Sequence, residues 1–395
     1  MDGRLRDGVV VVGGDARQRF YDASGYGRPL AEGLALAPVE AAHLLYRGDL
    51  DAVLVGRDGR VERLDFRGFL AAGAAGFAAR FLVYKDLRDR GFYLSPRPEP
   101  RTDVAVDRHE PPADVAESGL GARAAEADVD FAVHPRGTGP WDGEVRYRVR
   151  AVGERAPVPA ADLGDLVLAV VDEESELTYL ETDALAPEGT ASTGAPAVEG
   201  QLLDDGVLVW DPPTDLHEGA FYGQPFGQRE GGGAIQLSLV EAAYLAARGT
   251  LTLAGDGAAA GSSGTTDPGQ PGGPAADAPP GAEEAVEAIV AVGRAAEGER
   301  FDRRLRAYRA LRDAGLVPKT GFKFGADFRV YTAFDGLDDL GHSEYLVRCL
   351  EAGHVFPPRE LALDVRLAGG VRKRMVFARP VGEGLEWVVV ERLTP

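Results

Sequence analysis

Two long stretches of the sequence repeat the same residues in the same order, and this internal repeat constrains the fold more than any other feature. "APVEAAHLLYRGDL" in the first half matches "SLVEAAYLAARGTL" in the second, with Glu40 corresponding to Glu241. "FLVYKDLRDRG" and "LRAYRALRDAG" match further along, with Tyr84 corresponding to Tyr308. A repeat of roughly 200 residues indicates duplicated domains, because solenoid repeats are much shorter.

Two insertions explain why the spacing between the matches differs in the two halves. The Gly-, Pro-, Ala- and Ser-rich stretch at about 254–284 lengthens the second half and has almost nothing to bury, so we expect it to be disordered. The acidic, proline-containing stretch at about 98–127 lengthens the first half. We therefore expect two repeats, at 1–190 and 191–395.

Each repeat predicts the same order of elements. Strand-like segments ("DGVVVVGG"; "DDGVLVWDPP") come first, then a helical "VEAA" run, then a second helix that ends at Gly91 or Gly315, since glycine suits the residue after a helix end. A strand and a final pair of strands follow ("DLVLAVVDEESELTYLET"; "KRMVFARPVGEGLEWVVVERL"). The expected fold class is α+β, a tandem duplication in which each repeat has a small mixed α/β N-terminal subdomain and an α/β C-terminal subdomain.

The chain is acidic and poor in lysine. Its net charge is −20 at pH 7, and arginine supplies nearly all of the positive charge. Such a surface is typical of proteins in molar salt, where the Debye length is about 3 Å, although a GC-rich genome also favours arginine over lysine. The global charge argues against a nucleic-acid partner, but binding depends on the field of a local patch. The lysines are Lys85, Lys319, Lys323 and Lys373.

Neither a membrane span nor a secretory leader is expected. The sequence has no apolar run long enough to span a bilayer, and its start, "MDGRLRDGVVVVGG", lacks the apolar stretch of a signal peptide. We therefore predict a cytoplasmic protein with no membrane partner. The single cysteine, Cys349, excludes an internal disulfide and a cysteine-rich zinc site, and we expect it to be buried on a helix.

The two repeats differ at positions that can carry chemistry. "DVDFAVHPRGTG" ends its strand in His134, whereas the matching "GADFRVYTAFDG" ends its strand in Tyr331. The second repeat then has His342 beside Ser343, a good N-cap for the helix expected to follow. Further on it has Lys373, where the first repeat has about Gly164. Four arginines are expected around the same strand as this lysine: Arg366, Arg372, Arg374 and Arg379.

Taken singly, these residues have ordinary explanations. A tyrosine at a strand end is usually packing, a histidine at a helix start is usually a cap, and "VRKR" is usually a solvated face or a phosphate-contacting patch. The joint presence of the tyrosine, histidine and lysine in one repeat and their joint absence from the other favours a functional site. The remaining histidines lack such support.

Three motifs in order, "AYRALRDAGLVPKTGFKFGADFRVY", "GHSEYLV" and "VRLAGGVRKRMVFA", resemble the C-terminal catalytic domain of the archaeal tRNA-splicing endonucleases. The tandem layout is similar to the homodimeric, two-repeat branch of that family, and the charge suggests a halophile. The resemblance is dense from about 303 to 379. It implies a nuclease-like C-terminal subdomain in each repeat and a catalytic subdomain at about 303–395.

The resemblance implies that Tyr331, His342 and Lys373 are catalytic. Tyr331 would take the proton of the attacking 2′-hydroxyl or only orient it, His342 would protonate the leaving 5′-oxygen, and Lys373 would stabilise the charge at phosphorus. The products would carry a 2′,3′-cyclic phosphate and a 5′-hydroxyl, and no metal or other cofactor is implied. The implied substrate is precursor tRNA, cut at both splice sites of a bulge-helix-bulge fold.

The resemblance also implies two binding features. Arg366 and Arg392 would hold an unstacked base between them, although an ion pair of Arg392 with Glu391 or Glu386 explains that arginine equally well. An acidic hairpin of the first repeat would dock near the catalytic repeat of a second copy, which implies a homodimer. Its residues are Asp172, Glu173, Glu174 and Glu176. The simpler explanation is that any hairpin tip is polar.

Two other functions remain open from the sequence. A metal-dependent nuclease of restriction-enzyme type would need two carboxylates near Lys373, and Asp364 is the one candidate. A non-catalytic RNA-binding or assembly subunit would be expected to lack the tyrosine, histidine and lysine in both repeats, whereas this chain keeps them in the second.

Overall fold

The computed structural model describes residues 1–104, 111–121, 129–227, 233–254, 281–338 and 340–395. Most of the insert predicted to be disordered, and part of the acidic insert, lie outside the described residues. The chain forms two compact units. The first comprises Met1–Asp183, Val355–Arg366 and Val390–Pro395, and the second comprises Ala184–His354 and Leu367–Val389.

The first unit opens with a six-stranded sheet in the order β3-β4-β2-β1-β5-β6. Helix α1 packs on β2 and β4, and its partner helix is α3. The strands are β1 (Asp2–Arg6), β2 (Val9–Val12), β3 (Arg28–Leu30), β4 (Gly33–Leu36), β5 (Ala52–Arg57) and β6 (Arg60–Leu64). The helices are α1 (Pro38–Arg47), α2 (Phe66–Ala71), α3 (Phe77–Asp89) and, within the acidic insert, α4 (Val115–Ser118).

A second sheet of the first unit has its strands in the order β7-β8-β9-β11-β12, and α3 contacts β9 and β11. Its parallel pair is β9 with β11, and the other pairs are antiparallel. The strands are β7 (Leu94–Pro96), β8 (Phe131–Val133), β9 (Tyr147–Gly153), β11 (Leu166–Val171) and β12 (Leu177–Leu185). The short strands β10 (Val158–Pro159) and β21 (Val355–Phe356) pair separately.

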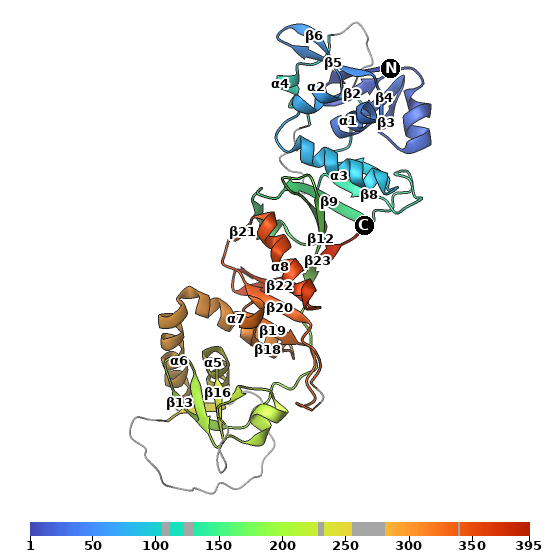
Figure 1. Ribbon diagram of the computed structural model, residues 1–395. Helices are drawn as coiled ribbons and strands as arrows, with labels where there is room; N and C mark the ends of the chain where they lie inside the picture. The colour runs from blue at the N-terminus through green and yellow to red at the C-terminus, as the bar shows by residue number, and fades with distance from the viewer. Residues whose placement is uncertain (105–110, 122–128, 228–232, 255–280, 339) are drawn as a thin grey trace. The chain divides into compact units, whose positions relative to one another are not determined.

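The second unit repeats this plan. Its first sheet has the order β15-β16-β14-β13-β17 and is covered by α5, α6 and α7 (Figure 1). The strands are β13 (Val198–Leu202), β14 (Val207–Trp210), β15 (Gln224–Pro225), β16 (Ala234–Leu237) and β17 (Leu251–Leu253). The helices are α5 (Leu239–Ala247), α6 (Ala282–Glu297) and α7 (Glu299–Asp313), so α6 begins inside the insert predicted to be disordered.

The second sheet of this unit has the order β18-β19-β20-β22-β23. One face of this sheet packs against α7, in a core that includes Phe328, Val347 and Val376. The strands are β18 (Val317–Thr320), β19 (Phe328–Tyr331), β20 (Tyr345–Cys349), β22 (Arg374–Val381) and β23 (Gly384–Leu393), with helix α8 (Pro358–Gly370) between β21 and β22.

The structure confirms the duplication in the details of its hydrogen bonds. Glu40 accepts from the backbone N–H groups of Gly27 and Ala37, and Glu241 accepts from those of Gly223 and Ser238. Strand register aligns the C-terminal subdomains as well. The backbone N–H of Asp130 donates to the carbonyl of Val149, and its carboxylate accepts from the N–H of Ala151. Asp327 makes the same two bonds, to the carbonyl of Val347 and from the N–H of Cys349.

The expected strands, the "VEAA" helices and the α+β class are confirmed, and so are the helix ends. Gly91 and Gly315 have φ of 88° and 77°, a left-handed conformation that glycine adopts without strain. Their N–H groups close the ends of α3 and α7 by bonding to the carbonyls of Arg88 and Arg312.

Two sequence-based expectations near the site are wrong. The segment after Ser343 is strand β20, not a helix, because Tyr345, Leu346 and Val347 complete a sheet between β19 and β22, and this pairing overrides local helix propensity. Cys349 is therefore at the end of a strand. Arg366 was expected around a strand and is on helix α8, which was not predicted.

No described helix is long and apolar enough to cross a membrane.

Candidate active site

Three strands of the second unit bring the predicted catalytic residues to one edge of their sheet (Figure 1). β19 runs antiparallel to β20 and β20 runs parallel to β22, so the end of β19 and the starts of β20 and β22 lie at the same edge. Tyr331 is the last residue of β19, His342 lies in the segment before β20, and Lys373 directly precedes β22. Residues that are far apart in the sequence are thus gathered by strand pairing.

The backbone of Glu344 ties this edge together. Its N–H donates to the carbonyl of Val330 at 2.9 Å, one residue before Tyr331. Its carbonyl accepts from the N–H of Arg374 at 2.9 Å, one residue after Lys373. The backbone at all three strand ends is therefore fixed by the same short ladder.

Tyr331 is buried, with 5% of its surface exposed, in a small apolar cluster. Its ring meets the ring of Phe221 edge to face, with centroids 5.7 Å apart, and Val317 and Phe334 belong to the same cluster. Among the described residues, none makes a hydrogen bond to its hydroxyl. The phenol is positioned by packing of its ring.

His342 is exposed in the extended segment that precedes β20. The neighbouring Ser343 is buried, so the chain is anchored next to an imidazole that has no partner among the described residues. An exposed histidine beside an anchored backbone can reach a substrate and exchange protons with it.

Lys373 is half-buried and donates a hydrogen bond from Nζ to the carbonyl of Ser343 at 2.7 Å. Its backbone is set by the end of α8, where Arg372 adopts a left-handed φ of 57° and the N–H of Lys373 bonds to the carbonyl of Ala368. Burial, and then the nearby positive charge of Arg329, lower the pKa of Lys373 below its usual value. The lysine is thus fixed next to the residue that follows His342.

Arg329 was missed in the sequence analysis. Its guanidinium carbon lies 5.8 Å from the centroid of the Tyr331 ring, and its charge acts on Lys373. It forms no ion pair with any described residue, and its buried Nε has no hydrogen-bond partner among them. Comparison of the repeats could have found it, because "FRVY" in the second repeat matches "FAVH" in the first, with Ala132 in place of the arginine.

The first repeat lacks this site. His134, which matches Tyr331, is buried and bonds through Nε2 to Oγ of Ser95 at 3.0 Å and through Nδ1 to the carbonyl of Glu144. It is a satisfied core residue. Strand register confirms the match of Gly164 to Lys373, because β11 pairs with β9 in the same register in which β22 pairs with β20.

The two predicted base-clamp arginines are both exposed, Arg366 on α8 and Arg392 on β23, and both are counted with the first unit. Glu386, one of the ion-pair partners considered for Arg392, is instead ion-paired with Arg379. The clamp therefore stays a prediction.

The acidic hairpin connects β11 and β12, and its residues have different roles. Asp172 accepts hydrogen bonds at Oδ1 from the N–H groups of Glu174 and Glu176, both at 2.9 Å, so its carboxylate folds the turn. Glu173 is paired with Arg155 at 2.6 Å. Glu174 and Glu176 are exposed and have no ion pair with any described residue.

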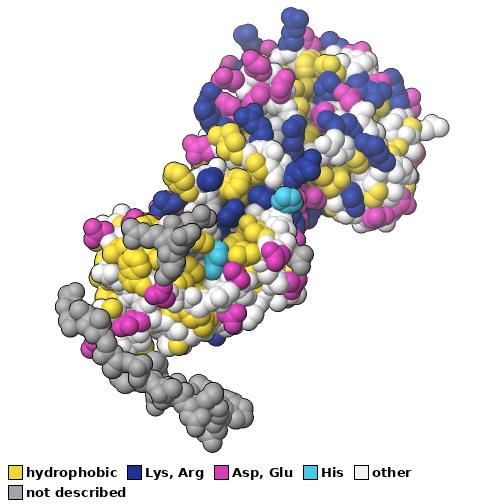
Figure 2. Space-filling model, turned by 60° about the horizontal axis from the view of Figure 1, so that its bottom comes forward, with side chains coloured by type: hydrophobic (Ala, Val, Ile, Leu, Met, Phe, Trp, Pro, Cys, Tyr) yellow, Lys and Arg dark blue, Asp and Glu magenta, His cyan; other side chains and the backbone are white. Residues whose placement is uncertain are grey.

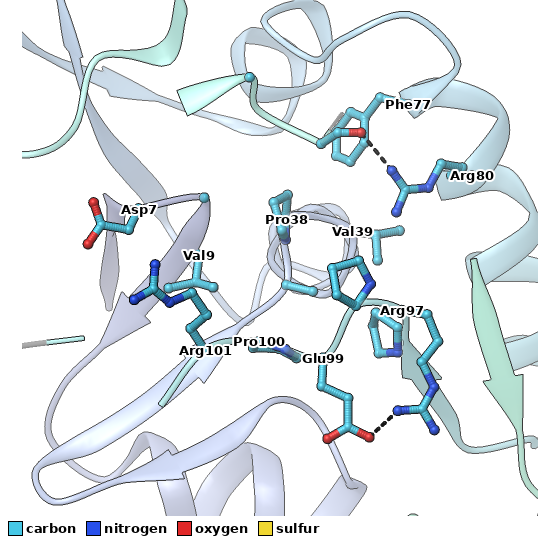
Figure 3. Close-up of a pocket in the computed structure, with 16 residues that line it drawn as sticks. Asp7, Val9, Pro38, Val39, Phe77, Arg80, Arg97, Glu99, Pro100 and Arg101 are labelled. Atoms are coloured by element: carbon cyan, nitrogen blue, oxygen red, sulfur yellow. Dashed lines mark hydrogen bonds and ion pairs between the residues drawn. The ribbon is translucent and has the colours of Figure 1, made fainter. Parts of the chain in front are cut away.

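A cavity of about 290 Å³ lies in the first unit (Figure 3). Arg80 at its wall already donates to the carbonyl of Gly121, and Arg97 is paired with Glu99. None of the predicted site residues lines it. We therefore do not place the active site there.

The described residues contain no group of three His, Cys, Asp or Glu side chains that could hold a metal ion. On the face shown in Figure 2, Lys and Arg side chains are interspersed with Asp and Glu. Positive groups are therefore available locally despite the net charge of −20.

A sheet edge that combines a phenol, an imidazole and an amine has the groups for acid–base catalysis, so the fold and site define an enzyme built by domain duplication. Family models identify it further. The model of the tRNA intron endonuclease catalytic C-terminal domain matches residues 301–386, and that of the N-terminal domain matches residues 1–65 and again 198–262. The chain belongs to the tRNA intron endonuclease family.

Full-length relatives agree with this assignment. The tRNA-splicing endonuclease of Natronomonas pharaonis is 52% identical over 397 residues, and that of Haloarcula marismortui 50% identical over 397 residues, each covering 100% of both chains. The tRNA-splicing endonuclease of Methanosarcina acetivorans is 33% identical over 412 residues, covering 100% of this chain and 99% of its own.

Proposed function

We propose that this chain excises introns from precursor tRNA by cutting both splice sites of a bulge-helix-bulge fold, with Tyr331, His342 and Lys373 as its catalytic residues. One observation carries the proposal. The three residues lie at one edge of one sheet, and the first repeat has a buried histidine and a glycine at the positions of Tyr331 and Lys373.

The chemistry follows from these groups. The 2′-oxygen of the nucleotide before the cut forms a bond to the adjacent phosphorus, and the bond from phosphorus to the 5′-oxygen breaks. The 2′-hydroxyl proton goes to the phenolate oxygen of Tyr331, or to water while Tyr331 orients the hydroxyl, and protonated His342 gives a proton to the leaving 5′-oxygen. The products are a 2′,3′-cyclic phosphate and a 5′-hydroxyl.

Lys373 supplies the fixed positive charge that this reaction needs at phosphorus. Its hydrogen bond to the Ser343 carbonyl and its place at the end of α8 hold the amine in position before the substrate arrives. Arg329 adds a second positive charge without an ion-pair partner among the described residues. Two fixed cations can perform the role that a metal ion performs in other nucleases, so the proposed reaction is metal-independent.

The proposed enzyme is a cytoplasmic homodimer. Exposed Glu174 and Glu176 of the first repeat are available to dock on a basic surface of a second copy, and two active sites would match two splice sites. Arg366 and Arg392 are proposed to stack on an extruded base, which guanidinium groups do without reading its identity.

Cleavage of an end-labelled RNA with two three-nucleotide bulges around a short helix tests the proposal. The assay uses excess EDTA and about 2 M KCl, because an acidic surface of this kind is suited to high salt. The variants are His342→Ala and, as a matched control, His354→Ala, which changes a histidine away from this edge. We expect cleavage in both bulges that survives EDTA, leaves cyclic phosphate ends, persists in the control and is lost in His342→Ala.

Two results would overturn the proposal. Cleavage that EDTA abolishes would assign the chemistry to a metal and to other residues. Cleavage that persists in His342→Ala at the wild-type rate would remove the histidine from the mechanism.

A further inference from the structure

Phe221 has a backbone conformation that is unusual for its residue type. Its φ is 55°, in the left-handed region where a side chain with a Cβ is strained. Gly25, the matching residue of the first repeat, has φ of 66°. The match is secure because the N–H groups of both residues bond to the carbonyl four residues earlier, at His217 and Tyr21 respectively. The second repeat thus has a strained phenylalanine where the first repeat has a glycine that suits the conformation.

A network of buried cations holds Phe221 in this conformation. Arg312 donates to the carbonyls of Ala220 at 3.2 Å and Phe221 at 3.4 Å. Lys319 donates to the carbonyl of Phe221 at 3.1 Å and to that of Gly223 at 3.0 Å. The arginine is shared with the first repeat, where Arg88 donates to the carbonyl of Ser24, but the lysine is not, since Ser95 stands in its place.

The side chain that this network presents packs directly on Tyr331. The Phe221 ring meets the Tyr331 ring edge to face at 5.7 Å and stacks on Phe334 at 4.8 Å with an interplanar angle of 13°. Phe334 stands three residues after Tyr331, and Gly137 stands three residues after His134. Both aromatic neighbours are therefore glycines in the first repeat.

The aromatic neighbours are present in the repeat whose strand-end residue is held by ring packing, and absent from the repeat whose strand-end residue is held by hydrogen bonds. His134 is oriented by two hydrogen bonds and needs no ring beside it. The hydroxyl of Tyr331 has no hydrogen-bond partner among the described residues, so the orientation of the phenol depends on the surfaces that its ring contacts. Strained backbone conformations cluster at functional sites, so the strain at Phe221 leads to a hypothesis about its function.

We propose that Phe221 is a positioning residue that holds the Tyr331 ring in its reactive orientation. The inference rests on the function proposed above for Tyr331. It extends the active site to the segment between β14 and β15, which contains none of the catalytic residues.

The test is Phe221→Gly, which restores the residue of the first repeat and removes the backbone strain together with the ring. In the RNA cleavage assay we expect kcat to fall about 10-fold or more with KM within about 2-fold of wild type, because the ring affects the reacting geometry and not the binding of RNA. The thermal midpoint should fall, because the variant removes a buried ring, and Phe221→Tyr should recover most of the rate. Phe226→Gly, which removes an exposed ring directly after β15, is the matched control and should leave kcat unchanged.

A double-mutant cycle separates positioning from a general structural effect. In a Tyr331→Phe background, Phe221→Gly should change the residual rate less than about 2-fold, since the hydroxyl that it positions is already gone. The same loss in both backgrounds, or a wild-type rate in Phe221→Gly, would overturn the inference and leave the proposed function intact. Because Phe221→Gly also removes buried apolar bulk, Phe221→Leu supplies the same comparison with most of that bulk retained. Absence of RNA cleavage by the wild-type chain would instead overturn the proposed function and this inference with it.

Discussion

The Nζ atom of Lys319 lies 2.7 Å from Oε1 of Glu241, and both side chains are buried. Burial raises the pKa of Glu241, but the charge of Lys319 and the hydrogen bonds outweigh burial, so its pKa is lowered overall. The same lysine holds the backbone carbonyls of Phe221 and Gly223. One buried ion pair thus joins α5 to β18 in the repeat that carries the proposed site.

Lys319→Met should lower the free energy of unfolding at pH 8 by about 3–5 kcal/mol, because it leaves a buried carboxylate without its cation. Urea unfolding at constant high KCl measures the change. The loss should shrink toward pH 5, since the unpaired Glu241 is then protonated. The double variant Lys319→Met/Glu241→Gln should cost less than the sum of the single variants, and strict additivity would argue against the pair.

The buried Glu40, which matches Glu241, should make stability depend on pH with the opposite sign, because its pKa is raised whereas that of Glu241 is lowered. Burial, opposed by hydrogen bonds from Gly27 and Ala37, raises the pKa of Glu40 to about 7, while its unfolded value is near 4.5. The folded state therefore holds its proton more tightly, and stability falls as pH rises from about 4.5 to 7, by about 3 kcal/mol in total. The thermal midpoint of wild type minus that of Glu40→Gln should fall over this range.

Glu241→Gln is the matched control for this measurement. Its carboxylate has a lowered pKa, so its stabilising contribution is present above the unfolded pKa and is lost as pH falls below it. The difference between wild type and Glu241→Gln should therefore grow as pH rises toward about 4.5 and stay constant from there to pH 7. Parallel curves for the two variants would contradict the assignment of opposite environments to matching residues.

Lys373 should lose its proton at a lower pH than Lys85. Burial and Arg329 lower the pKa of Lys373, whereas the hydrogen bond to Asp89 raises that of Lys85. NMR titration after reductive ¹³C-methylation measures both, and Lys373→Arg assigns the signal in a chain with so few lysines. In Arg329→Gln the titration of Lys373 should move to higher pH, because a nearby positive charge has been removed. An unchanged titration would mean that Arg329 does not act on the amine.

Variants of the acidic hairpin should distinguish residues that are needed for association from residues that are needed for folding. Glu174→Ala/Glu176→Ala removes exposed charges and should convert a dimer to a monomer in light-scattering measurements at high salt, with the thermal midpoint unchanged. Asp172→Ala should reduce association and also lower the midpoint, because Oδ1 of Asp172 folds the turn. A double variant that stays dimeric would assign the dimer contact to another surface.

Much of the architecture could be predicted because the two repeats constrain one another. Matched "VEAA" helices and glycine helix ends reflect short-range physics, namely side-chain periodicity and left-handed caps, which the local sequence encodes. The correspondence of Gly164 to Lys373 was also readable, since the matched strands keep the same pairing register.

The errors arose where tertiary pairing decides the structure. "SEYLVRCLEAG" can form a helix by its local pattern, and it becomes β20 because β19 and β22 offer partners on both sides. The aromatic surroundings of Tyr331 could not be derived either, since Phe221 is more than a hundred residues away and its left-handed backbone depends on Lys319 and Arg312.

Gly164 has φ of 127°, and a Cβ built on it would meet no atom within 4 Å. There is room for a side chain at this position, but the backbone has a conformation that residues other than glycine rarely adopt. Substituting lysine there would not recreate the geometry of Lys373, because the chain would first have to take a different path into β11. A lysine at this position of the first repeat would therefore need further changes in the backbone before it could act as Lys373 is proposed to act, so a single substitution is not expected to make the two repeats equivalent.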